Sequence, residues 1–267
     1  MALSNKVIRE RALTIYKEHR FLLALIVFIQ SLPLFLFIPL NILYSQKNAI
    51  LVAVITAIIN GVIFFPLVRI GSCHILLKIW HGEKTTFPAI FYFYNKNDYL
   101  SAVLLGFIIS IITLLFNIPR IFINIDQGAQ NNPIQLLSIF ALTMLTLLME
   151  IWLQIKMAPA PYLYAAGYSR KPFALARESF RDMKNNVGGY IKFNIAVYWW
   201  RVLIILTIIF ALFIRLTVSG TYNENNIYVV IVAVIFTGVL ASVILNPYPT
   251  LAVAGFIDNL LPSRKNI

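Results

Sequence analysis

Residues 159–168 read Pro-Ala-Pro-Tyr-Leu-Tyr-Ala-Ala-Gly-Tyr, and residues 247–256 repeat the pattern as Pro-Tyr-Pro-Thr-Leu-Ala-Val-Ala-Gly-Phe. Each copy closes a long apolar segment just before charged residues return. Because proline has no N–H, two prolines one residue apart remove two helical donors, so the helix must bend or restart there. The sequence therefore predicts two helix-break motifs. They are formed by Pro159, Pro161 and Gly167 in the first copy and by Pro247, Pro249 and Gly255 in the second.

The two glycines are expected to serve a local purpose. Glycine tolerates backbone angles and contacts that a Cβ forbids, so Gly167 and Gly255 should each supply a close approach or a turn. Replacing either by leucine is then expected to do similar damage. Within a membrane, such breaks persist only where other protein or water satisfies the freed carbonyls. We expect both motifs at the cytoplasmic ends of membrane helices; a duplication kept for packing alone is the alternative.

The composition is typical of a membrane protein. Of the 267 residues, 60% are hydrophobic and 12% are charged, and the mean hydropathy is +0.81. A soluble domain carries about 25% charged residues. Several apolar runs reach about 20 residues, which is enough to cross a hydrocarbon core of about 30 Å. The basic start leads into such a run without a cleavage site, so the first helix is expected to remain as an anchor.

These runs predict an all-α fold, a six-helix transmembrane bundle in a single membrane domain with cytoplasmic amphipathic helices. The expected parts are an amphipathic helix at residues 4–20 and three hairpin-like units at residues 21–70, 100–166 and 191–257, within a domain covering residues 1–267. In the first helix an apolar face lies among basic residues, which suits the surface of an anionic leaflet. A second amphipathic helix is expected between residues 168 and 190, with Phe173, Ala176, Phe180, Met183 and Val187 on its apolar face.

The basic residues predict the orientation of this bundle. With six spans, both termini lie on one side, and the segments on that side carry nearly all of the Lys and Arg between the spans. The segments on the opposite side hold only Lys47. Positively charged loops stay in the cytoplasm, so both termini are expected there, next to an anionic inner leaflet.

Short motifs along the chain resemble a known family. They are Arg11-Ala12-Leu13; Gly71, Leu76, Leu77 and Gly82; Ala176, Ser179, Met183 and Asn186; and Pro247, Tyr248, Ala252, Ala254 and Phe256. Their order is similar to that in the bacterial integral-membrane family called domain of unknown function 975 and in related uncharacterised inner-membrane proteins. The resemblance implies a multi-pass protein of the bacterial cytoplasmic (inner) membrane, and no known activity comes with it. The family often has Pro-Gly where this chain has Pro119-Arg120.

Few residues could carry chemistry. Glu150 and Arg201 are expected at similar depth in two spans, where a lone charge costs a few kcal/mol, so they form a candidate buried polar pair. This pair could bind an ion, a proton or a lipid headgroup, or it could be a purely structural ion pair. Lys156 is expected to extend to the inner interface. His74 and His81 lie near Cys73, but no third and fourth ligand stands at metal-binding spacing, so neither a metal, a cofactor nor a catalytic residue is predicted.

The sequence therefore favours a non-enzymatic membrane protein that interacts with lipid or partner proteins, in envelope maintenance or as an accessory subunit. A small transporter or channel that uses Glu150 and Arg201 is the alternative, because broken helices at repeat boundaries often mark transport sites. An intramembrane enzyme is a third class without a supporting motif. Membrane lipids are the expected partner, a second protein or a homo-oligomer stays open, and nucleic acid is not expected.

Overall fold

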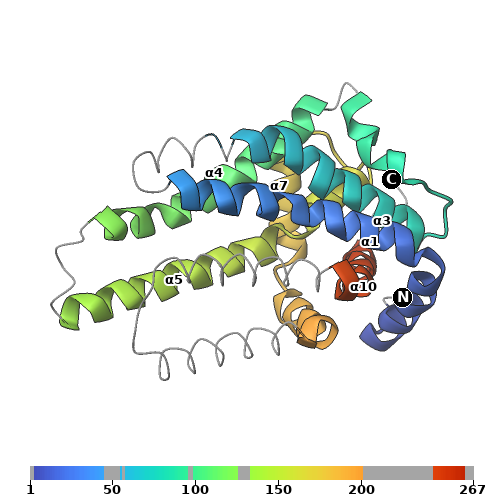
Figure 1. Ribbon diagram of the computed structural model, residues 1–267. Coiled ribbons are helices and arrows are strands. Elements are labelled where there is room, and N and C mark those ends of the chain that lie inside the picture. The colour runs from blue at the N-terminus through green and yellow to red at the C-terminus, as the bar shows by residue number, and fades with distance from the viewer. Residues whose placement is uncertain are drawn as a thin grey trace, which may run out of the picture. The chain divides into compact units, whose positions relative to one another are not determined.

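The computed structural model describes residues 3–44, 55, 58–95, 99–125, 133–200 and 243–261. This part of the chain is mostly helical and has no strand, which confirms the all-α class for the described residues (Figure 1). The helices are α1 (Asn5–Tyr44), the π-helix η1 (Asn60–Gly71), α3 (Ser72–Trp80), the 3-10 helix η2 (Phe87–Asn95), α4 (Tyr99–Ile125), α5 (Pro133–Met157), α6 (Pro159–Ala165), α7 (Pro172–Asp182) and α10 (Pro247–Leu260). Residues 187–200 are also helical.

Among the described residues, no helix is both long enough and apolar enough to cross a membrane. Much of the predicted third hairpin, including Arg201, lies outside the described residues. Residues 45–54 and 126–132, within the first and second predicted hairpins, also lie there. The division into three hairpins therefore stays a prediction.

The chain forms two compact units. The first comprises Met1–Leu34, Leu76–Phe87 and Gly188–Ile267, and the second comprises Phe35–Ile75 and Pro88–Val187. Each unit is therefore built from segments that are distant in sequence.

In the first unit, the amphipathic start of α1 lies with its apolar face against protein. Ile8 and Ala12, one helical turn apart, are fully buried. Farther along the same face, the ring of Tyr16 lies edge-on to that of Tyr248, with centroids 6.5 Å apart. The backbone leaves helical geometry at His19, with φ −115° and ψ 19°. The kink therefore falls at the predicted junction between the amphipathic helix and the apolar run after it.

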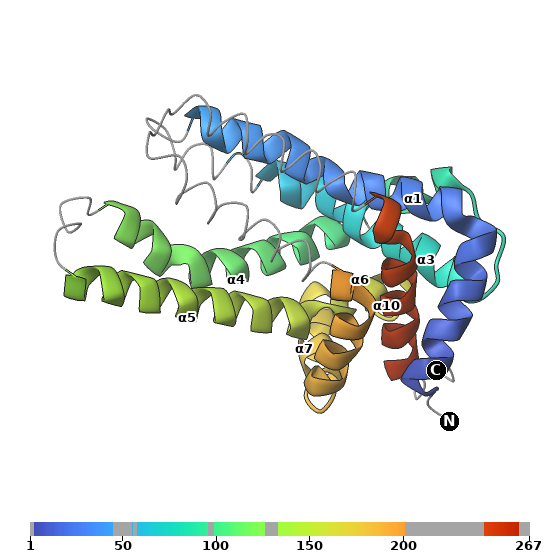
Figure 2. The same cartoon turned by 60° about the horizontal axis from the view of Figure 1, so that its bottom comes forward.

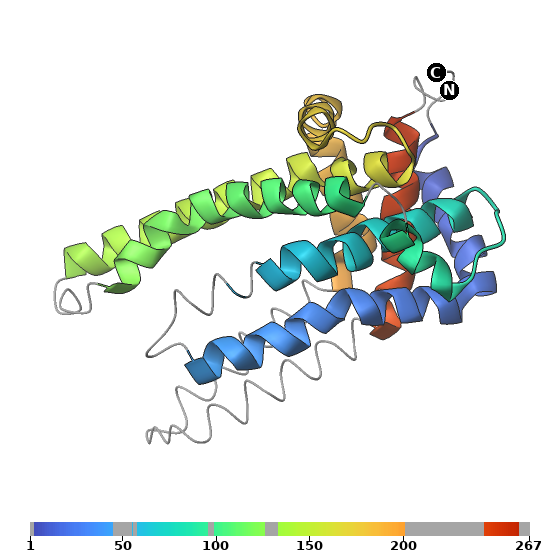
Figure 3. The same ribbon diagram turned by 90° about the horizontal axis from the view of Figure 1, so that it is seen from above.

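In the second unit, α4 packs against η1 on one side and α5 on another, and the latter pair runs side by side in Figures 2 and 3. Two glycines permit close contacts here. A Cβ on Gly71 would overlap the carbonyl oxygen of Ile90, and a Cβ on Gly106 would lie 2.8 Å from the ring of Phe65. Glycine is therefore required at both positions by the approach of a neighbouring segment.

The orientation of α7 differs from the predicted one. Helix α7 packs against α4, α5 and α6. Its buried side chains are Leu175 and Ser179, and Met183 directly after the helix is also buried. Phe173, expected on the apolar face, is 77% exposed. The physical reason is a buried hydrogen bond from Ser179 to α5, which fixes the rotation of the helix against its neighbour.

Candidate functional site

The first proline motif interrupts a helix at positions where the missing proline N–H groups cost no intrahelical hydrogen bond. Helix α5 ends at Met157, and α6 begins at Pro159 after the single turn residue Ala158. Pro159 and Pro161 then occupy the first turn of α6, where backbone N–H groups have no intrahelical acceptor. The carbonyl of Ile155, which Pro159 cannot satisfy, accepts instead from the N–H of Ala158 at 3.3 Å.

Gly167 closes the first motif as a turn. Its φ is +78°, and its N–H donates to Tyr164 at 3.0 Å while the N–H of Tyr168 donates back to Leu163 at 3.0 Å. This pair of bonds is the Schellman ending of a helix, which needs a left-handed residue at this position. Gly82 ends α3 in the same way: its φ is +78°, its N–H donates to the carbonyl of Ile79 at 3.0 Å, and the N–H of Glu83 donates to the carbonyl of Lys78 at 2.9 Å.

The second proline motif starts in the same way but ends differently. Helix α10 begins at Pro247, after the bend at Asn246, whose carbonyl accepts from the N–H of Thr250 at 2.9 Å. Gly255, however, lies inside α10, which continues to Leu260. A Cβ on Gly255 would lie 2.5 to 2.7 Å from three ring atoms of Trp80. The two matched glycines thus have different purposes, a turn at Gly167 and a close approach at Gly255.

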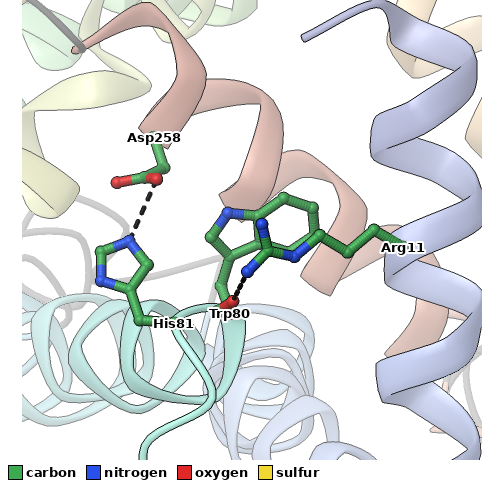
Figure 4. A network of polar contacts seen from close by, with 4 residues as sticks. All are labelled: Arg11, Trp80, His81 and Asp258. Carbon is green, nitrogen blue, oxygen red and sulfur yellow. Dashed lines mark hydrogen bonds and ion pairs between the residues drawn. The ribbon is translucent and has the colours of Figure 1, made fainter.

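Trp80 and the adjacent His81 each make a polar contact in the first unit, and both contacts are drawn in Figure 4. The Arg11 guanidinium donates to the carbonyl of Trp80 at 2.8 Å and lies 4.7 Å from the centroid of its ring. His81 Nε2 lies 3.1 Å from Asp258 Oδ2. We call Arg11, Trp80, His81, Gly255 and Asp258 the Trp80 clamp. The clamp joins the start of α1, the end of α3 and the middle of α10.

A second contact strengthens the link between α1 and α10. The side-chain amide of Asn259 accepts from the N–H of Leu3 at 2.8 Å and donates to the carbonyl of Leu3 at 3.1 Å. One side chain therefore satisfies both backbone groups of a residue 256 positions away in sequence. Together with the Trp80 clamp, this contact holds the basic residues at the start of α1 in a defined place on the first unit.

An aromatic cluster in the second unit surrounds another arginine. The Arg170 guanidinium donates to the carbonyl of Tyr164 at 3.2 Å and lies 4.9 Å from that ring's centroid and 5.8 Å from that of Phe93. Phe93 contacts Tyr164 edge-on at 5.4 Å, and His74 stacks on Tyr92 at 4.6 Å. His74 and His81 therefore have separate aromatic and acidic neighbours. No group of three His, Cys, Asp or Glu residues within the described part could hold a metal ion.

Lys156 is buried near the first proline motif, with 8% of its surface exposed. Its Nζ donates to the carbonyl of Met183, the residue that caps α7, at 3.3 Å. A cation at this position is favourable because the last carbonyls of a helix carry partial negative charge. Ser179 donates its hydroxyl to the carbonyl of Lys156 at 2.7 Å. Lys156 thus links α5 to α7, a role that differs from the predicted extension to the interface.

The predicted pair of Glu150 and Arg201 is not placed, because Arg201 lies outside the described residues. Glu150 accepts a hydrogen bond from Gln154 at 3.2 Å, one helical turn away.

Cys73 is 5% exposed, and burial raises the pKa of its thiol to about 12 against the lowering effects of Arg69 and a hydrogen bond from Tyr162. A nucleophilic cysteine needs a lowered thiol pKa. The raised pKa and the burial of Cys73 are instead those of a core residue.

Sequence reasoning missed the Trp80 clamp. Arg11 and Trp80 are 69 residues apart in the sequence, and only the fold brings them together with Gly255. The available signal was Gly255 itself, a glycine within an apolar run for which a close approach or a turn is predicted, but the sequence does not show which side chain approaches it. No protein-family model, curated protein or solved structure matches this chain.

Proposed function

We propose that this chain is a non-enzymatic, multi-pass protein of the bacterial cytoplasmic (inner) membrane that interacts with lipid, in envelope maintenance or as an accessory subunit. The observation that carries the proposal is the surface of α5. Its exposed large apolar side chains, each at least 37% accessible, are Leu142, Met144, Leu145, Leu147, Leu148, Met149, Ile151 and Trp152. They lie on several sides of one helix, and water disfavours such a contiguous apolar surface. Lipid tails would cover it.

Other helices add to this apolar surface. Phe21 on α1, Leu100 on α4 and Trp199 in the helix of residues 187–200 are each more than half exposed. The long apolar runs of the full sequence and its mean hydropathy of +0.81 support the same environment. The proposed arrangement is the six-span bundle, with both termini in the cytoplasm. The resemblance to the domain of unknown function 975 family belongs to this proposal.

Anionic lipid is the proposed partner of the start of α1. Lys6, Arg9, Lys17 and Arg20 are exposed there, while the apolar face of the same helix is buried against protein. A row of exposed cations next to the membrane attracts anionic headgroups by about 1 kcal/mol for each Lys or Arg. Because the Trp80 clamp fixes this helix, its exposed cations can bind a leaflet without the entropy cost of ordering the helix first.

The test is purification from native membranes after alkaline carbonate washing, followed by mass spectrometry of bound lipids and proteins. The protein is expected to resist carbonate and to carry anionic phospholipid. The K6Q/R9Q variant should retain less anionic lipid, whereas a K84Q variant, also neutralised at an exposed lysine, should retain more than the double variant. Release of the protein by carbonate would contradict the membrane placement.

A small transporter or channel is the second candidate. It is favoured by the interrupted helices at Ala158 and Asn246 and by the 12-residue π-helix η1, because discontinuous and π-helical segments often lie at functional sites. In proteoliposomes, ion or solute flux that the wild type supports and Glu150→Gln abolishes would favour this candidate. Equal leak from empty and protein-containing vesicles would count against it.

A further inference from the structure

The outward face of α7 has an unusual combination of side chains. On α7, residues 173, 177 and 181 lie within one stripe, opposite the buried Leu175 and Ser179, and residue 184 lies in the turn that follows the helix. Together they present one large aromatic ring and three cations, namely Phe173, Arg177, Arg181 and Lys184, all of which are exposed. We call these four residues the α7 stripe.

The aromatic ring at the start of the stripe is held outward by the helix itself. Pro172 occupies the first turn of α7 and Lys171 precedes it, so the backbone at Phe173 is fixed by the helix start. The ring is 77% exposed although the neighbouring Leu175 is fully buried. An exposed phenylalanine on an ordered helix loses free energy in water and gains it when it enters an apolar layer.

The charges around this ring are predominantly positive. From residue 170 to residue 184 the chain holds five basic and two acidic residues. The ion pair between Arg181 and Glu178 is 3.7 Å long, and the Arg181 side chain is 65% exposed. Exposed pairs of this kind contribute little, so Arg181 can exchange Glu178 for a phosphate.

We propose that the α7 stripe docks on the surface of an anionic lipid bilayer, with the Phe173 ring entering the headgroup boundary while Arg177, Arg181 and Lys184 contact lipid phosphates. This inference rests on the proposed function, because it requires α7 to lie beside a membrane. It adds a second lipid contact, in the second unit, to that of α1. An aromatic ring flanked by Lys and Arg matches the interface, where apolar and anionic layers adjoin.

The stripe is tested on the full chain in lipid nanodiscs. Cys73→Ala removes the single native thiol, and Phe173→Cys then receives the fluorophore nitrobenzoxadiazole. Emission and iodide quenching are compared in phosphatidylcholine alone and in phosphatidylcholine with phosphatidylglycerol. Only with phosphatidylglycerol do we expect the emission to shift to the blue and iodide to quench it less. Added salt should reduce the blue shift and restore the quenching, because it screens the charges.

Two matched double variants locate the effect. R177Q/R181Q removes two cations from the stripe and should return the label to its phosphatidylcholine spectrum, because each cation strengthens binding to an anionic surface by about fivefold. R9Q/K17Q removes two cations from α1 and should leave the label protected. Size-exclusion profiles of all variants report whether they stay folded.

The outcomes separate the two proposals. A chain that incorporates into nanodiscs but shows the same label spectrum in both lipids overturns the docking surface alone. Protection that appears only when soluble acidic protein is added also overturns it and identifies a protein partner. Failure to incorporate into either lipid overturns the membrane placement, and the inference fails with it.

Discussion

At the residue scale, Gly255 is constrained by the ring beside it. The indole of Trp80 is 2% exposed, and Arg11 contacts both its ring and its backbone carbonyl, so the ring has little room to move away from a new Cβ. We predict that Gly255→Ala lowers the free energy of unfolding by about 1–3 kcal/mol, the usual cost of overpacking. Chemical unfolding in detergent measures it. The control is Gly189→Ala, where a Cβ would meet only Phe256 at 3.9 Å. An equal loss in both variants would refute the close approach.

Gly167 is constrained by its backbone and not by a neighbour. Its φ is +78°, and a Cβ would meet no atom within 4 Å. Any residue with a Cβ should therefore lose about 1–2 kcal/mol there, with Asn losing less. We predict that Gly167→Leu and Gly167→Ala have similar melting temperatures, whereas Gly255→Leu melts far below Gly255→Ala. A strong dependence on side-chain size at Gly167 would contradict this. The sequence-based expectation of similar damage at both glycines is replaced by this difference.

Cys73 offers a test of burial by pH. Its raised pKa means that the folded state keeps the proton between pH 9 and about 12, so stability falls as pH rises through this range. At pH 8 the raised pKa keeps the thiol protonated, and a thiol reacts far more slowly than a thiolate. We predict that a maleimide labels Cys73 very slowly in the folded protein and fast after unfolding in dodecyl sulfate, as measured by mass spectrometry. Rapid labelling at pH 8 without unfolding would show that the thiol is accessible.

At the scale of elements, α7 is fixed by two bonds at the end of α5. Ser179 donates to the carbonyl of Lys156, and Lys156 donates to the carbonyl of Met183. We predict that Ser179→Ala costs about 1–3 kcal/mol, because it leaves a buried carbonyl without this donor. Hydrogen exchange within α7 should then accelerate. Arg177→Gln, on the opposite face of the same helix, is the control and should change neither value. Unchanged exchange in Ser179→Ala would show that apolar packing alone fixes α7.

The same element shows how far sequence patterns reach. The helical class, the restart at each proline pair and the junction near His19 follow from local chemistry, because proline and apolar periodicity act within one or two turns. The rotation of α7 does not follow from periodicity. Phe173 and Phe180 suggested the inner face. The Phe180 ring does lie 5.9 Å from that of Trp152 on α5, but Phe173 is exposed, and the buried positions are Leu175 and Ser179, whose hydroxyl is bonded to α5. The Trp80 clamp was missed for the same reason, since its members meet only through tertiary contacts.

At the scale of the whole molecule, the distribution of charge predicts the topology. The predicted segments on one side hold Lys and Arg in every interval, and the other side holds only Lys47. The exposed cations of α1 and of the α7 stripe fall in segments predicted for the basic side, as the proposed lipid contacts require. If the start of α1 and the α7 stripe were on opposite sides of the membrane, they could not both bind the same anionic leaflet.

Reporter fusions decide this topology directly. We predict that alkaline phosphatase is active when fused after Gly128 or Gly220, because both positions follow spans that lead out of the cytoplasm, and that it is inactive after Asn186. A fluorescent protein, which matures in the cytoplasm, should give the opposite pattern. Asn186 lies two residues after Lys184, so this fusion also reports the side on which the α7 stripe stands. Retention of basic loops in the cytoplasm is the physical cause. Phosphatase activity after Asn186 would place the α7 stripe outside and overturn both the six-span arrangement and docking on the inner leaflet.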